Sequence, residues 1–189
     1  MFTWDSIQRR PDGKILLLYR HERVFDAGLI RRGSRVLDVG GWGVLASRAI
    51  EEGADCLLLD NFSKDQYYAE RVRSLPHVSG DVLDRKLLDT LGVFDVVTCF
   101  EMLEHCLDQE TAVANMYACL KPGGFFVGTV PLPGVVHAAD EPGIRFLDEK
   151  QLSGLLRHVG FVSISLERTG SVSADAIPCS IYFCAGKRC

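Results

Sequence analysis

The sequence lacks the features that mark membrane, secreted and nucleic-acid-binding proteins. No run approaches the roughly 20 apolar residues that a membrane-spanning helix requires. The first residues lack the charged, apolar and small-residue regions of a signal peptide, so we expect a cytoplasmic protein without a membrane span. Positive charge is not in excess, because the formal net charge is -4, and this balance disfavours nucleic acid as a partner.

The seven cysteines lack the spacing of a metal site or of a disulfide framework. Their number is odd, no Cys-x-x-Cys pair occurs, and most of them lie in apolar stretches. This pattern predicts reduced thiols in the core and argues against zinc.

The composition is that of an ordinary globular domain. Hydrophobic residues make up 47% of the 189-residue chain and charged residues 24%, which fits a single domain over residues 1–189 with a sizeable core. Apolar runs and helical spacing of apolar residues then alternate along the chain, and this alternation predicts an α/β fold with an open, mostly parallel sheet.

The expected elements follow from this patterning and from turn signals. Strands are expected at 35–39, 56–59, 77–79, 94–100, 125–130, 161–166 and 180–185. Helices are expected at 14–32, 44–52, 63–74, from Asp108 or Thr111 to Leu120, and from Asp148 or Glu149 to His158. The last two strands have no helix between them, so they should pair antiparallel. Residues 1–33 would form an N-terminal helical cap, and the long irregular stretch 131–145 would be a functional loop at a binding site.

The most informative stretch is Val36-Leu37-Asp38-Val39-Gly40-Gly41-Trp42-Gly43, where a strand runs into a glycine-rich turn and then a helix. Glycine allows close approach of a ligand to the backbone, and the amides of a helix start favour an anionic group. The turn predicts a cofactor-binding site, although a turn with a purely structural role fits the same residues.

Acidic residues follow the next two strands at informative spacings. Asp60, with Asn61 beside it, stands about 20 positions after the turn, where a carboxylate accepts hydrogen bonds from both ribose hydroxyls. Asp60 as a helix cap is the alternative. Asp81 and the amide of Val82 fit an adenine edge, unless Asp81 only completes a turn. Because no Walker motif and no full G-x-G-x-x-G occurs, a nucleoside without phosphates is favoured.

The ordered motifs of the chain resemble those of class I S-adenosylmethionine-dependent methyltransferases. The resemblance covers most of the chain and rests on 36–43, Leu59-Asp60, Gly80-Asp81, Phe94 to His105, and Leu120-Lys121-Pro122-Gly123-Gly124. It implies a Rossmann-like, seven-stranded, mostly parallel sheet with helices on both faces and an antiparallel last strand. The family's usual glycine motif is one residue longer, so the glycine that touches the cofactor is open among Gly40, Gly41 and Gly43.

The resemblance assigns the cofactor S-adenosylmethionine to particular residues. Asp38 and the glycine turn would hold its methionine part, Asp60 the ribose, Asp81 and Val82 the adenine, and Phe100 one flank. Arg20 stands where ubiquinone-type O-methyltransferases have a basic residue that contacts the cofactor carboxylate, although a solvated helix charge is an equal alternative.

Methyl transfer from a sulfonium needs alignment and, for some acceptors, a base. His105 is the candidate base because imidazole accepts a proton near neutral pH, and a structural or capping histidine is the alternative. Glu101, Glu104 and His105, with His137 as a fourth ligand, would form a divalent metal site in the less favoured alternative.

The acceptor should be a small molecule methylated on oxygen or nitrogen, because no recognition domain is inserted. Its pocket is expected among Trp4, Tyr19, His137, Asp140, Glu141 and Arg145. A metal-assisted RNA 3′-terminal methyltransferase and a non-catalytic nucleoside-binding or partner-binding module are the competing hypotheses.

Overall fold

A computed structural model of the chain describes residues 18–61, 72–134, 143–170, 175 and 177–189. These residues form a seven-stranded sheet in the order β3-β2-β1-β4-β5-β7-β6, in which β7 runs antiparallel to both of its neighbours and the other pairings are parallel. The strands are β1 (Arg35–Val39), β2 (Asp55–Asp60), β3 (His77–Ser79), β4 (Phe94–Phe100), β5 (Leu120–Pro131), β6 (Val162–Thr169) and β7 (Ser180–Gly186). The predicted mostly parallel sheet with an antiparallel last strand is confirmed.

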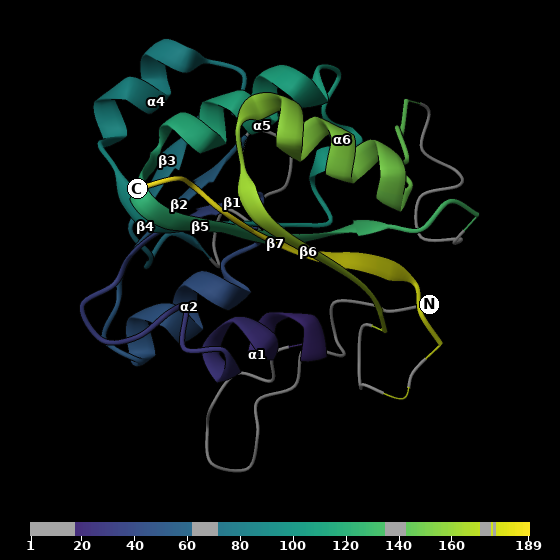
Figure 1. Cartoon of the computed structure of the whole chain (residues 1–189). Coiled ribbons are helices and arrows are strands. Elements are labelled where there is room, and N and C mark those ends of the chain that lie inside the picture. The colour runs from purple at the N-terminus through teal and green to yellow at the C-terminus, as the bar shows by residue number, and fades with distance from the viewer. Residues whose placement is uncertain (1–17, 62–71, 135–142, 171–174, 176) are drawn as a thin grey trace.

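Helices cover both faces of this sheet. Figure 1 shows α1 and α2 on one face and α4, α5 and α6 on the other. Their bounds are α1 (Tyr19–Asp26), α2 (Val44–Glu51), α4 (Arg85–Leu91), α5 (Gln109–Ala118) and α6 (Glu149–Val159), and the short 3-10 turn η3 (Leu103–His105) follows β4. The sheet is therefore the middle layer of three, which is why its central strands are apolar without alternation.

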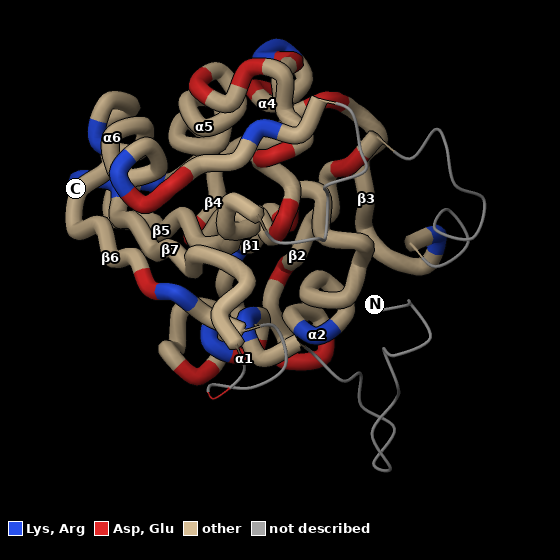
Figure 2. The backbone as a smooth tube through the Cα atoms, turned by 90° about the vertical axis from the view of Figure 1, so that its right-hand side faces the viewer, with Lys and Arg blue, Asp and Glu red and all other residues tan. Residues whose placement is uncertain are grey.

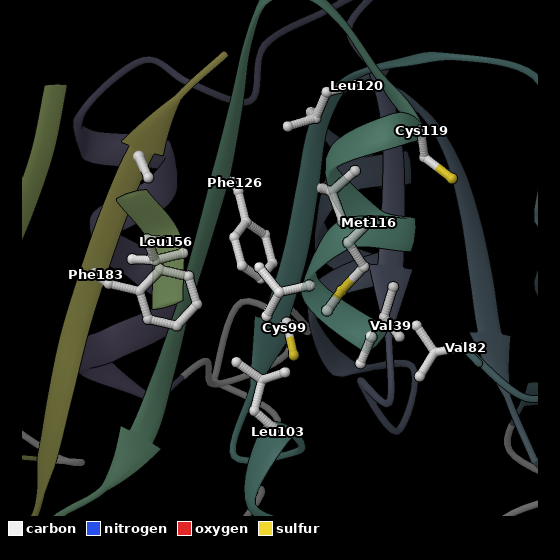
Figure 3. Packing of buried hydrophobic residues seen from close by; sticks show 14 of the residues in the cluster. Val39, Val82, Cys99, Leu103, Met116, Cys119, Leu120, Phe126, Leu156 and Phe183 are labelled. Atoms are coloured by element: carbon white, nitrogen blue, oxygen red, sulfur yellow. The ribbon is translucent and has the colours of Figure 1, made fainter. Parts of the chain in front are cut away.

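The core lies on both sides of the sheet. On the α5 and α6 side, Phe126 packs against Phe183 with ring centroids 4.8 Å apart, and Met116 of α5 is fully buried beside them (Figure 3). On the α1 and α2 side, Val24 and Ala49 are fully buried in the second cluster. Burial on both faces holds the central strands in place and so determines where their ends lie.

Several element bounds differ from those the sequence predicted, each for a local reason. The helix α4 was not predicted, and it begins where the Asp84 side chain accepts a hydrogen bond from the Leu87 amide. The predicted helix 14–32 ends at Asp26 within the described residues, because Gly28 takes a left-handed backbone with φ of 66°. Leu120 is not helical but pairs with Phe94 in the sheet, so β5 begins earlier than predicted. Most of the predicted helix 63–74 lies outside the described residues.

The cysteines lie where the sequence predicts reduced thiols of the core. All seven cysteines are free thiols, and Cys56, Cys99, Cys106 and Cys119 are buried in the core. Burial raises the pKa of the Cys106 thiol to about 12, which keeps it protonated. Of the helices in the described ranges, none has the length and apolar character needed to cross a membrane.

Candidate active site

The carboxyl ends of β1, β2, β3 and β4 meet at one edge of the sheet, and most of the predicted site residues lie there. Figure 2 looks onto this edge, where acidic segments gather around the ends of these strands. Two backbone contacts join the strand ends directly: the Gly40 amide donates to the Leu59 carbonyl at 2.9 Å, and the Gly80 amide donates to the Asp60 carbonyl at 3.0 Å. The glycine turn, Asp60 and the turn after β3 therefore form one continuous rim.

The glycines of the turn are required by packing against the protein's own atoms. A Cβ on Gly40 would collide with the Met102 side chain, and one on Gly41 would collide with the Asp38 carboxylate. Gly43 caps α2 in a left-handed conformation with φ of 74°, and Trp42 takes a positive φ of 48° as well. The shortened turn thus has a structural reason for each glycine, and none of these contacts tests which glycine touches a cofactor.

Asp38 is the most unusual residue of the edge, because its side chain is fully buried. Its Oδ1 accepts a hydrogen bond from the Thr98 hydroxyl on the neighbouring strand at 2.8 Å, whereas its Oδ2 has no hydrogen-bond partner within the described part of the chain. Burial raises the pKa of Asp38 to about 7; the hydrogen bond from Thr98 and the nearby backbone amide of Ala46 oppose the rise, and the Asp60 charge adds to it. A cationic group beside Oδ2 would offset the free-energy cost of burying the charged carboxylate.

Asp60 and Asn61 lie where the ribose contact is predicted. Asp60 ends β2, is half-buried, and accepts a hydrogen bond from the Asn61 amide at 2.6 Å. Its charge reaches Asp38, as the effect of Asp60 on the pKa of Asp38 shows. The two carboxylates predicted to contact one cofactor are thus near neighbours, and the ribose assignment stays a prediction.

Asp81 and Val82 occupy the turn after β3 and face different surroundings. Asp81 is exposed, and its Oδ1 accepts a hydrogen bond from the Leu83 amide at 2.9 Å, so the turn role that the sequence left open is present. Val82 is buried, and its carbonyl accepts a hydrogen bond from the Asn115 side chain at 2.9 Å. The adenine contact of these two residues stays a prediction.

Arg20 and Phe100 are connected through the buried end of β4. Arg20 forms an ion pair with Glu101 at 3.5 Å, and both side chains are nearly buried, with exposed fractions of 11% and 7%. Arg20 is therefore not the solvated helix charge of the alternative interpretation. Phe100 is buried too, and the ring of His21 meets its ring edge-on with centroids 4.5 Å apart.

Glu104 and His105 belong to η3, the turn that follows β4. Glu104 is buried, and the His105 side chain is 45% exposed with its Nε2 3.9 Å from a Glu104 oxygen. In the described ranges, no three His, Cys, Asp or Glu side chains are close enough to hold a metal ion. Glu101, Glu104 and His105 alone therefore form no ligand cluster, and His137 lies outside the described residues.

The predicted acceptor residues are only partly described. Trp4, Asp140 and Glu141 lie outside the described residues, as His137 does, and Tyr19 begins α1. Arg145 is brought against η3, because its amide donates to the Glu104 carbonyl at 2.9 Å.

Three residues at this edge were missed by sequence reasoning. Thr98 and His21 look like ordinary strand and helix positions, and only the fold brings them to Asp38 and Phe100. Gln109, the first residue of α5, donates through Nε2 to the carbonyls of Leu103 and Arg145. No sequence signal distinguishes such a bridging side chain from a solvated one.

A known protein family matches most of this chain. The family model described as "Methyltransferase domain" matches residues 17–166. The chain belongs to this methyltransferase family. The predicted resemblance to class I S-adenosylmethionine-dependent methyltransferases is confirmed, and the open edge of the sheet is accordingly the candidate active site of this methyltransferase.

Curated relatives carry the name ubiquinone biosynthesis O-methyltransferase. This methyltransferase is 32% identical to the one of Chromobacterium violaceum over 152 residues, which cover 68% of this chain and 64% of the relative. It is 36% identical to the one of Vibrio parahaemolyticus over 99 residues, which cover 49% of this chain and 41% of the relative. The chain thus spans between about two fifths and two thirds of the length of these relatives.

Solved structures share the fold at low sequence identity. A SAM-dependent methyltransferase from Archaeoglobus fulgidus matches with a TM-score of 0.70 and 17% identity over 88% of this chain and 92% of that one. A 1,6-didemethyltoxoflavin-N1-methyltransferase from Burkholderia thailandensis, solved with its acceptor and S-adenosylhomocysteine, matches with a TM-score of 0.65 and 22% identity, covering 90% of this chain and 78% of that one.

Proposed function

We propose that this protein transfers a methyl group from S-adenosylmethionine to an oxygen or nitrogen of a small-molecule acceptor in the cytoplasm. The observation that carries the proposal is the buried Asp38 carboxylate, whose Oδ2 has no partner among the described residues. The cofactor's methionine part carries an ammonium group, and a buried carboxylate is stabilised by a cation of this kind. The names of the curated relatives support oxygen as the methylated atom.

The remaining residues of the edge suit the rest of the same cofactor. Asp60 would accept hydrogen bonds from the ribose hydroxyls, and the Asp81–Val82 turn would contact the adenine. Phe100 and the paired Arg20 would bound the methionine end, where the guanidinium can bind the cofactor carboxylate.

When bound, S-adenosylmethionine supplies a methyl group already activated by its sulfonium. The protein then has to hold the acceptor in line and, for a hydroxyl or a protonated amine, to remove a proton. His105 is exposed on η3 and is our candidate for that base. The proton would move from the acceptor oxygen or nitrogen to an imidazole nitrogen of His105.

The proposal is tested by incubating the protein with methyl-labelled S-adenosylmethionine and a panel of small hydroxylated and amino compounds. We expect a labelled product whose mass has gained one methyl group in place of hydrogen. Cofactor binding without any labelled product would favour the non-catalytic alternative. Activity that is abolished by a chelator and restored by a divalent ion would favour the metal-assisted alternative.

A further inference from the structure

The segment that arrives at α6 from the acceptor loop is fastened to η3 at one residue, Arg145. Its amide donates to the Glu104 carbonyl at 2.9 Å, and its carbonyl accepts from Gln109 Nε2 at 2.8 Å. The same Nε2 also donates to the Leu103 carbonyl at 3.0 Å. Both backbone groups of Arg145 are therefore held in the strip of structure that carries His105.

The side chain of Arg145, in contrast, is exposed and forms no ion pair or hydrogen bond with the described residues. Asp108 lies near enough that Arg145 contributes to lowering the pKa of its carboxyl, after the amide and hydroxyl of Thr111. Both oxygens of Asp108 already accept hydrogen bonds from Thr111. A fixed backbone and a solvent-exposed guanidinium together describe a group available to a ligand.

The charge around Arg145 makes this placement informative. The neighbouring strand ends carry Asp38, Asp60, Asp81 and Glu101, and Arg20, at the same edge, is paired with Glu101. A cationic residue whose backbone is fixed beside an acidic edge offers an anionic ligand both a specific partner and an orientation, since guanidinium binds carboxylates and phosphates through a two-pronged contact.

We propose that Arg145 binds an anionic group of the methyl acceptor, a carboxylate or a phosphate, and that Gln109 is the positioning residue that holds Arg145 beside His105. The inference rests on the proposed methyl transfer and adds the class of substrate to it. The anionic group is bound at Arg145 while the hydroxyl or amine to be methylated faces His105.

The experiment uses acceptors in matched pairs that differ only in charge. Protocatechuic acid and para-aminobenzoic acid, for oxygen and nitrogen transfer, are each compared with their carboxamides. For phosphate, 3-hydroxyphenyl phosphate is compared with its neutral dimethyl ester, which keeps the same free hydroxyl. Binding of S-adenosylhomocysteine is measured on the same samples. A failure of the proposed function shows as no methyl transfer to either member of any pair, with or without cofactor binding, whereas a failure of the inference shows as transfer that does not depend on the anionic group.

We expect kcat/KM for the accepted anion to exceed that for its neutral twin by about tenfold, which corresponds to about 1.4 kcal/mol. Arg145→Gln should remove this preference mainly through KM, Arg145→Lys should restore part of it, and Gln109→Leu should weaken it. Arg157→Gln, which removes an exposed arginine of α6, is the matched control and should keep the preference.

Three results would overturn the inference. These are methylation of the neutral twins as efficient as that of the anions, survival of the preference in Arg145→Gln, and methylation of neutral twins by a protein that accepts none of the anions. A carboxylate preference without a phosphate preference, or the reverse, identifies which anion the site takes and supports it.

Discussion

Replacing Asp38 with asparagine should change how the stability of the protein depends on pH. The pKa of Asp38 is about 7 in the folded protein and 3.8 for an ordinary aspartate. At pH values between these two, the folded state therefore holds a proton on Asp38 that the unfolded state has lost. Stability therefore falls as the pH rises from about 4 to about 7 and levels off above that. The pKa differs by about three units between the two states. At about 1.4 kcal/mol per unit, this corresponds to a change of about 4 kcal/mol in the free energy of unfolding.

The assay is urea unfolding of wild type and Asp38→Asn at pH 5 and pH 8. From pH 5 to pH 8, titration of Asp38 should lower the free energy of unfolding of the wild type by about 2 to 3 kcal/mol. The variant lacks this carboxyl group and should not show this contribution. Because each protein is compared with itself, the cost of burying an unpaired amide cancels. Asp55→Asn removes an exposed carboxylate and is the control that should keep the wild-type dependence. If the free energy of unfolding changes equally with pH in wild type and Asp38→Asn, the pKa of Asp38 is not raised in the folded protein.

Three further changes test other parts of the site. Asp60→Ala should weaken binding of S-adenosylhomocysteine by roughly 1 to 3 kcal/mol, because the ribose hydroxyls lose their acceptor; unchanged affinity in a calorimetric titration would contradict the ribose assignment. His105→Ala should slow turnover by about a hundredfold or more while cofactor affinity stays the same, and retained turnover would mean that alignment alone suffices. Gly41→Ala should lower the free energy of unfolding by roughly 1 to 3 kcal/mol, because the added Cβ meets the Asp38 carboxylate; a thermal melt identical to wild type would show that the turn can relax.

Much of the fold was predictable because its signals are local. The strands 35–39, 77–79 and 94–100 were predicted with the bounds observed for β1, β3 and β4, since an apolar run between turn residues is visible in the sequence. The helix α4 was missed because it is short, with Leu88 as its buried residue, and its Asp84 cap reads equally well as a loop aspartate.

The site was predictable where family motifs mark it and not where contacts cross the fold. Asp38, Asp60 and Asp81 follow strand ends, and a parallel sheet brings such positions to one edge. The pairing of Arg20 with Glu101 joins residues 81 positions apart, and the link from Gln109 to Arg145 joins side chain to backbone. Partners of this kind depend on packing that no local pattern encodes.

The edge of the sheet around Asp38 should bind S-adenosylmethionine through the cofactor's ammonium group. The most direct measurement is a calorimetric titration of S-adenosylmethionine into the protein across the pH range around 7. We expect one bound molecule per chain, with a wild-type affinity that rises about tenfold for each pH unit up to pH 7. In Asp38→Asn the affinity should be weak, and the titration of residue 38 should no longer contribute to its pH dependence. No binding by the folded protein, or the same pH dependence in both proteins, would contradict it.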